Sequence, residues 1–250
     1  MVFRQLFEPT SSTYTYLLAC RRTGQAALID PVYDTIERDL ALVQELGLTL
    51  VYTLETHIHA DHLTGARRAK SLVGSRIAAP KMDGLSCVDE GVEEGRAFQV
   101  GDLQLQPLFT PGHTDTHHAY VLEQHGTTRV FTGDCLLIDG CGRTDFQNGD
   151  VRRQFQSIRE KLFRLPDETL VCPAHDYEGR FVSSIAQEKT RNPRIGLDKE
   201  EDEFIDIMNN LKLPYPKRID LAVPGNRLCG ECPPEIPEAL QRLCEPHDQG

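Results

Sequence analysis

The segment Thr56–His62 reads Thr-His-Ile-His-Ala-Asp-His and holds a tight cluster of potential metal ligands. Imidazole and carboxylate groups, here on His57, His59, Asp61 and His62, suit zinc, iron or manganese. A single histidine is more often an ordinary buried or exposed residue. A cluster this dense, directly after an apolar run, would be costly to pack without a compensating partner. The segment therefore indicates a metal site.

Three further residues of ligand type occur in similar surroundings. His113 lies in Thr-Pro-Gly-His, Asp134 in Thr-Gly-Asp and His175 in Pro-Ala-His. Each follows a predicted strand, and small or turn-forming residues come directly before it. Strand ends of layered α/β proteins are where sites are usually assembled. We therefore expect these three side chains to join the cluster at 57–62 in one site.

The elements that must position these residues follow from hydrophobic patterning. Short apolar runs predict strands at 14–20, 26–30, 48–54, 76–79, 103–109, 119–123, 129–132 and 169–172. Apolar residues at helical spacing predict helices at 34–46, 63–73, 150–163 and 203–211. Mixed strands flanked by helices favour a layered α/β architecture.

Composition excludes several classes of protein. The 250 residues carry 38 acidic and 27 basic side chains, a net charge of −11, which argues against binding to nucleic acid or to an anionic membrane face. No apolar run approaches the length of a membrane span, and the first residues lack the pattern of a secretory signal, so we expect a cytoplasmic protein. We expect the eight cysteines to be reduced thiols. Cys229 and Cys232 form a C-x-x-C without a second pair, so a zinc site is not expected there.

The H-x-H-x-D-H motif at 57–62, together with His113, Asp134 and His175, resembles the metallo-β-lactamase superfamily. The resemblance implies an αββα sandwich, an α/β fold with two mixed sheets flanked by helices and a metal site along one edge of the sheets. It also implies one domain over residues 1–250, with a core at about 10–190 and a helical and loop extension at about 191–250.

Two glutathione-linked branches of that superfamily compete. The stretch Cys141–Gln147 (C-G-R-T-D-F-Q) and the stretch Pro173–Tyr177 (P-A-H-D-Y) resemble the persulfide dioxygenase branch. The glyoxalase II branch, of thioester hydrolases with two metals, tends to have aromatic and acidic residues in the first loop and G-H-E-Y in the second. Asn192–Arg194 and Ala222–Asn226 extend the resemblance toward the C-terminus. The pair at 117–118 departs from it, since relatives commonly carry small residues there.

For the metal, the dioxygenase branch implies one Fe(II) per chain, held by the catalytic residues His57, His113 and Asp134. Two histidines and one carboxylate on one face of iron leave positions open for substrate and O₂. The remaining residues of ligand type would be hydrogen-bonding partners of that centre, or would complete a second metal site in the hydrolase branch: His59, Asp61, His62 and His175. The residues alone leave both uses open.

For the reaction, the resemblance implies that glutathione persulfide, O₂ and water give sulfite and glutathione. The alternative is hydrolysis of an acylglutathione by two metals, and a third reading is a metal-bearing binding module without turnover. Candidate substrate contacts are Tyr177, Arg143, Arg191 and Arg227, with Arg143 equally suited to holding its own loop through Asp145. A homodimer is common among relatives, and any sulfur-transferase partner would be a separate chain.

Overall fold

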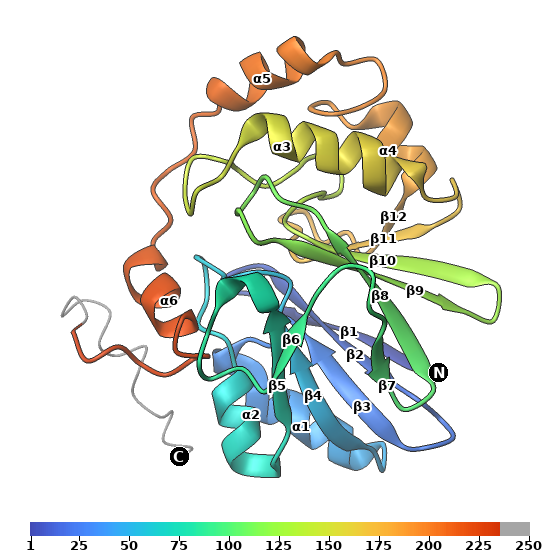
Figure 1. The fold of residues 1–250 in the computed structure, drawn as a ribbon, viewed down its shortest axis with the longest axis vertical. Coiled ribbons are helices and arrows are strands. Elements are labelled where there is room, and N and C mark those ends of the chain that lie inside the picture. The colour runs from blue at the N-terminus through green and yellow to red at the C-terminus, as the bar shows by residue number, and fades with distance from the viewer. Residues whose placement is uncertain (236–250) are drawn as a thin grey trace.

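Two six-stranded mixed sheets face each other at the centre of the computed structural model, which describes residues 1–235 (Figure 1). The first sheet has the order β1-β2-β3-β4-β5-β6. Its strands are β1 (Val2–Glu8), β2 (Thr13–Ala19), β3 (Gln25–Ile29), β4 (Thr49–Leu54), β5 (Arg76–Pro80) and β6 (Glu90–Val92). The second sheet has the order β12-β11-β10-β9-β8-β7. Its strands are β7 (Phe98–Val100), β8 (Leu103–Phe109), β9 (His118–Gln124), β10 (Thr127–Gly133), β11 (Leu170–Pro173) and β12 (Ser183–Ser184).

Large side chains from the inner faces of both sheets form the central core. Every residue of β2 is buried, which its run of apolar and aromatic residues favours. The ring of Tyr16 from the first sheet meets that of Phe131 from the second at a centroid distance of 5.0 Å, edge to face. The two sheets therefore share one apolar interior, and their ends are fixed relative to each other.

Helices cover the outer face of each sheet (Figure 1). On the first sheet lie α1 (Ile36–Glu45) and α2 (Ala66–Val73), which bury Ile36, Val43 and Ala69 with outward residues of the strands. The second sheet is covered by α3 (Val151–Gln156), α4 (Ile185–Arg191) and α5 (Glu201–Asn209), and α6 (Ile219–Asn226) lies beside the sandwich. The layers run helix, sheet, sheet, helix, so the expected αββα architecture is confirmed.

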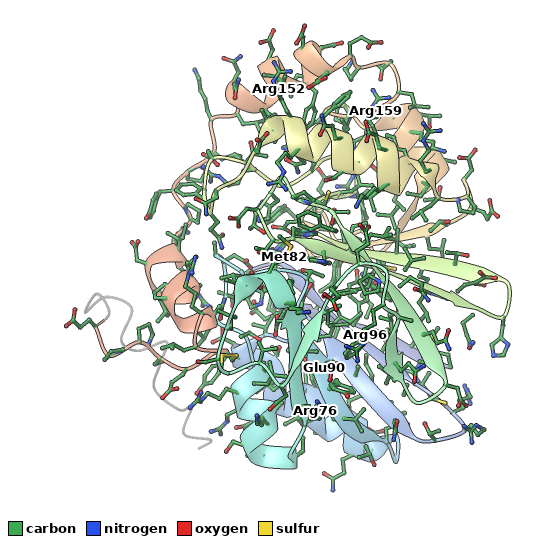
Figure 2. The ribbon with its side chains drawn as sticks, in the orientation of Figure 1. Arg76, Met82, Glu90, Arg96, Arg152 and Arg159 are labelled. Atoms are coloured by element: carbon green, nitrogen blue, oxygen red, sulfur yellow. A yellow bond between two sulfur atoms is a disulfide. The ribbon has the colours of Figure 1, made fainter. Side chains whose placement is uncertain are left out.

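Ion pairs and hydrogen bonds connect the elements of the outer layers, and Figure 2 labels some of the side chains that form them. Arg152 of α3 pairs with Glu201 of α5 at 2.9 Å, and Arg159 donates to the carbonyls of Gly196 and Lys199. Across β5 and β6, Arg76 and Arg96 both approach the carboxylate of Glu90. Each exposed ion pair of this kind adds little to the free energy of unfolding. These pairs therefore indicate which chain segments lie side by side and are a minor source of stability.

The eight predicted strands all form, with bounds shifted by a few residues, and the predicted helices differ in instructive ways. The helix expected from Leu63 begins at Ala66, because Thr64 makes a β-bridge to Val32 instead. The helix expected at 150–163 begins after Asp150, whose carboxylate caps it, and continues through a π-helical turn at Ser157–Lys161. The strand β1 was not predicted, and neither were the short elements β6, β7, β12, α4 and α6, which contain too few periodic positions to give a signal.

The expectation of reduced thiols is wrong for Cys87, Cys229 and Cys232, which are all disulfide-bonded. Cys87 and Cys229 form a disulfide with an S–S distance of 2.08 Å. The two residues are 142 positions apart, so only the folded chain brings the loop before β6 against the turn after α6. Four buried cysteines are free thiols: Cys20, Cys135, Cys141 and Cys172.

Within residues 1–235, no helix combines the length and the apolar character needed to cross a bilayer.

A buried carboxylate on α1 gives a test of the first helix–sheet layer. The Asp39 side chain is fully buried, and burial raises its pKa from 3.8 to about 6, although Arg38 donates to one oxygen. The folded state therefore holds the Asp39 proton more tightly than the unfolded state does. Its contribution to stability is present at low pH and is lost as pH rises through the window from about 4 to 6.

We expect Asp39→Asn to remove this dependence. Relative to the wild type, the variant should gain about 3 kcal/mol of unfolding free energy between pH 4 and pH 7. Urea denaturation at several pH values measures this, with Glu45→Gln, at an exposed position of the same helix, as the control. Parallel pH profiles for wild type and Asp39→Asn would contradict the assignment.

Candidate metal centre

Four strand exits deliver the predicted ligands to one place between the sheets. His57 to His62 follow β4 in the first sheet. His113, Asp134 and His175 follow β8, β10 and β11 in the second sheet. The site therefore exists only where both sheets end together, as the sequence analysis expects for a layered α/β protein.

One cluster consists of His57, His113 and Asp134, whose potential ligand atoms all lie within 4.8 Å of one another. Nε2 of His113 is 3.5 Å from Oδ2 of Asp134. Nδ1 of His113 is 2.6 Å from the carbonyl oxygen of Arg143, which can only accept, so Nδ1 carries the proton. In the neutral ring the lone pair is then on Nε2, which faces the cluster.

Asp30 and Thr56 orient the ring of His57 in a similar way. Asp30 accepts hydrogen bonds from the backbone N–H and the hydroxyl of Thr56, at 2.7 and 2.9 Å. The Thr56 oxygen is then free to accept from Nδ1 of His57 at 2.9 Å. Burial, together with neighbouring histidines, holds the pKa of His57 well below its usual value. His57 is therefore neutral and has the protonation state that a metal ligand requires.

A second cluster consists of His59, Asp61 and His62. Nδ1 of His62 lies 2.8 Å from Oδ2 of Asp61. Nε2 of His175 is 3.5 Å from both Asp61 Oδ2 and Asp134 Oδ1, so it links this cluster to the first. Although burial disfavours the charged ring, Asp134 and Asp61 raise the pKa of His175 to about 9.

His59 differs from its neighbours because two carboxylates face it. Its Nε2 lies 3.1 Å from Asp30 and 3.5 Å from Glu55. Burial opposes protonation, but these carboxylates outweigh it and raise the pKa of His59 well above its usual value. All three residues are buried. The Asp30–Glu55–His59 group also brings potential ligand atoms together, although no predicted ligand other than His59 takes part.

Unpaired polar atoms in the two clusters are suited to binding a cation. Oδ1 of Asp134 and Nε2 of His62 are buried and have no hydrogen-bond partner. An unpaired polar atom in a protein interior is costly, and a carboxylate oxygen is especially so. A metal ion would satisfy these atoms, and the mixture of imidazole and carboxylate suits a transition metal.

Glycines and a buried histidine set the position of Asp134. Gly133 has a φ of +49°, and a Cβ there would lie 2.4 Å from Nε2 of His117. That nitrogen accepts the backbone N–H of Asp134 at 3.3 Å, and Nδ1 of His117 pairs with the hydroxyl of Thr110 at 2.8 Å. Burial keeps the pKa of His117 well below its usual value, so the ring stays neutral and able to accept. The departure from the family pattern at 117 thus places a supporting residue beneath the ligand.

Two residues that the sequence analysis did not select hold the backbone of the metal-binding loop, 56–65. Asn226 donates to the carbonyls of His59 and His62 at 2.9 and 2.8 Å, and its oxygen accepts the N–H of Thr64 at 2.8 Å. Gln147 donates to the carbonyl of Ile58 at 2.7 Å. Asp30, Glu55 and His117 were missed as site residues as well. Asp30 meets Thr56 only through tertiary packing, and nothing in the local pattern separates Glu55 or His117 from an ordinary polar residue.

Of the predicted substrate contacts, Tyr177 lies against a residue of this centre, and the side chains of the arginines lie elsewhere. The exposed ring of Tyr177 lies parallel to that of His175 at a centroid distance of 6.1 Å. Arg143 is engaged by both oxygens of Asp145 and by the carbonyl of Pro214. Arg191 pairs with Asp139 at 3.3 Å, and Arg227 is exposed in the turn after α6. Arg143 could bind a substrate carboxylate or hold its own loop through Asp145. The contacts that it makes are those that hold the loop.

The chain is similar to known proteins over most of its length. Residues 9–175 match the family model described as the metallo-beta-lactamase superfamily. A bovine (Bos taurus) protein named persulfide dioxygenase ETHE1, mitochondrial, is 47% identical over 236 residues, covering 94% of this chain and 91% of that protein.

This chain belongs to the persulfide dioxygenase family of the metallo-β-lactamase superfamily. The crystal structure of ETHE1 from Myxococcus xanthus is similar to it with a TM-score of 0.88 and 52% identity, covering 92% of this chain and all of that one. A hydroxyacylglutathione hydrolase from Polaromonas is 37% identical over 70% of this chain and 66% of its own length. Membership of the persulfide dioxygenase family thus accounts for nearly the whole chain, whereas the hydrolase matches a shorter part of it.

A pair of glycines in one loop tests whether the geometry around Asp134 matters. A Cβ on Gly142 would lie 2.5 Å from the carbonyl oxygen of Asp134 and 2.8 Å from Nδ1 of His113. A Cβ on Gly140 would meet nothing closer than 3.8 Å. We expect Gly142→Ala to lower metal affinity by about tenfold or more, and Gly140→Ala to leave it unchanged. Metal titration with a competing chelator measures both, and equal affinities would refute the prediction.

Proposed function

We propose that this protein oxidises glutathione persulfide with O₂ and water to sulfite and glutathione, using one Fe(II) per chain. The observation that carries the proposal is the match along nearly the whole chain to a persulfide dioxygenase, with the His57–His113–Asp134 cluster complete. The hydrolase alternative is weaker, because its relative covers a shorter part of the chain.

The three residues of that cluster are the proposed iron ligands. Two imidazoles and one carboxylate form the facial arrangement of non-haem Fe(II) oxygenases. When bound, Fe(II) supplies adjacent open positions for the persulfide sulfur and O₂, and the electrons that activate O₂. The chain contributes the orientation of the donors: Asp30 and Thr56 orient His57, the Arg143 carbonyl orients His113, and His117 holds Asp134.

The remaining residues of ligand type are proposed as hydrogen-bonding partners of this centre. His59 faces the carboxylates of Asp30 and Glu55, which favour its protonated form. His175 lies between Asp61 and Asp134, with Nε2 3.5 Å from an oxygen of each, so we assign it the role of orienting both carboxylates. His62 then serves to hold Asp61.

For substrate binding we propose Tyr177 at the rim of the site, with Arg191 and Arg227 as candidates for the carboxylates of glutathione. Tyr177 is the best placed, since its ring is exposed and stacks on His175. Arg143 stays a candidate only if its contact with Asp145 opens. A homodimer, a separate sulfur-transferase partner and a cytoplasmic location stay predictions from the sequence.

The test combines metal content with oxygen uptake. Protein loaded anaerobically with Fe(II) should hold about one iron per chain and consume O₂ only when glutathione persulfide is added. Two metals per chain, together with hydrolysis of lactoylglutathione in the absence of O₂, would instead support the alternative.

We expect Asp134→Ala to lose iron and to lower kcat/KM for oxygen uptake by more than about 100-fold, because a ligand counts for more than its outer partners. Asp167→Ala, which removes a surface carboxylate paired with Lys189, is the matched control and should behave like the wild type. An iron-replete, active Asp134→Ala variant would overturn the ligand assignment.

A further inference from the structure

The Cys87–Cys229 disulfide joins two segments that border the metal-binding loop. Cys87 lies between the 3-10 turn Lys81–Asp83 and β6, and Cys229 lies in the turn that follows α6. A small cavity separates the disulfide from the metal-binding loop, and His57, His59, Asn226 and Cys229 are among the residues that line it. The crosslink and the metal-binding loop therefore border the same cavity.

The turn after α6 is seated tightly on the metal-binding loop and the start of α2. Asn226 holds the carbonyls of His59 and His62. The carbonyl of Cys229 accepts the backbone N–H of Arg67 at 3.0 Å. Gly230 has a φ of +91°, and a Cβ there would lie 2.1 Å from the carbonyl oxygen of Thr64. A change in the position of this turn must therefore reach the backbone that carries the predicted ligands.

The two cysteines of the crosslink differ in exposure. Cys229 is 3% exposed, whereas Cys87 is only half-buried. Thiol–disulfide exchange proceeds by attack of a thiolate on an accessible sulfur. An attacking thiol therefore reaches Cys87 first, and Cys229 leaves as the thiolate.

We propose that the Cys87–Cys229 disulfide is a thiol-controlled crosslink that sets how firmly the metal-binding loop holds its ion, and that glutathione opens it. The proposal rests on the proposed function only for the identity of the thiol, since glutathione is the thiol that the proposed reaction releases. A glutathione thiolate attacks Cys87, breaking its bond to Cys229, which takes up a proton. A second glutathione thiolate then attacks the mixed disulfide, releasing oxidised glutathione and the Cys87 thiolate, so two electrons pass to the protein.

Opening the crosslink frees the turn after α6 from the segment before β6. The hydrogen bonds from Asn226 to the loop carbonyls then lose their covalent support, and the loop that carries His57 to His62 gains freedom. Because outer contacts tune how well ligands hold a metal, the reduced protein should release its ion faster than the oxidised protein.

The experiment measures metal release directly and needs no turnover. The full chain is loaded with Zn(II), incubated with or without millimolar glutathione, and desalted anaerobically. Release to a chromogenic chelator is then followed, and alkylation with mass spectrometry reports which cysteines are reduced. We expect release to be about tenfold faster when Cys87 and Cys229 are thiols. A failure of the dioxygenase proposal would leave this result unchanged.

Variants assign the effect to this crosslink. Cys87→Ser and Asn226→Ala should release zinc at the fast rate with or without glutathione treatment. Cys232 is also disulfide-bonded, so Cys232→Ser is the matched control and should keep the redox-dependent difference, as should Cys20→Ser. Equal release rates in wild-type protein with Cys87 and Cys229 shown to be open would overturn the proposal. A crosslink that stays intact in millimolar glutathione would also overturn the proposal. Both outcomes are measured on the wild-type protein and need no variant.

Discussion

The structure depends most on the burial of one carboxylate that protein groups alone do not satisfy. Oδ1 of Asp134 is buried without a hydrogen-bond partner, and its two oxygens face Nε2 of His175 and His113 at 3.5 Å. Removing a carboxylate from water without full compensation is expensive. A bound cation removes that cost, so the free energy of metal binding and that of folding are coupled. The backbone at Gly133 and the ring of His117, which accepts the N–H of Asp134, keep the carboxylate in this position.

This constraint explains why the site lies between the sheets. His57 belongs to the first sheet and His113 and Asp134 to the second, so the ligand atoms meet only when the core around Tyr16 and Phe131 has closed. Interiors of this kind pack closely and resist small displacements. The same rigidity makes the loop contacts of Asn226 and the crosslink beside it relevant to the metal, because the ligands have little freedom to compensate for a shifted backbone.

The convergence of the predicted ligands could be foreseen from the sequence, because each residue follows a run of apolar residues and His57 to His62 are dense enough to stand out. The supporting residues could not. Asp30 ends an ordinary strand, and Asn226 stands in a short helix that gave no periodic signal, yet both reach the metal-binding loop. Cys87 and Cys229 were expected as separate thiols, since nothing local to either residue indicates its partner. Such contacts are set by tertiary packing, which a pattern within a single segment does not contain.

The most direct measurement is anomalous diffraction at the iron absorption edge from crystals of protein loaded anaerobically with Fe(II). The account predicts one anomalous peak per chain, bounded by Nε2 of His57, Nε2 of His113 and the carboxylate of Asp134, with part of its coordination sphere open to solvent. Two peaks, or a single peak held by His59, Asp61 and His62 instead, would contradict it.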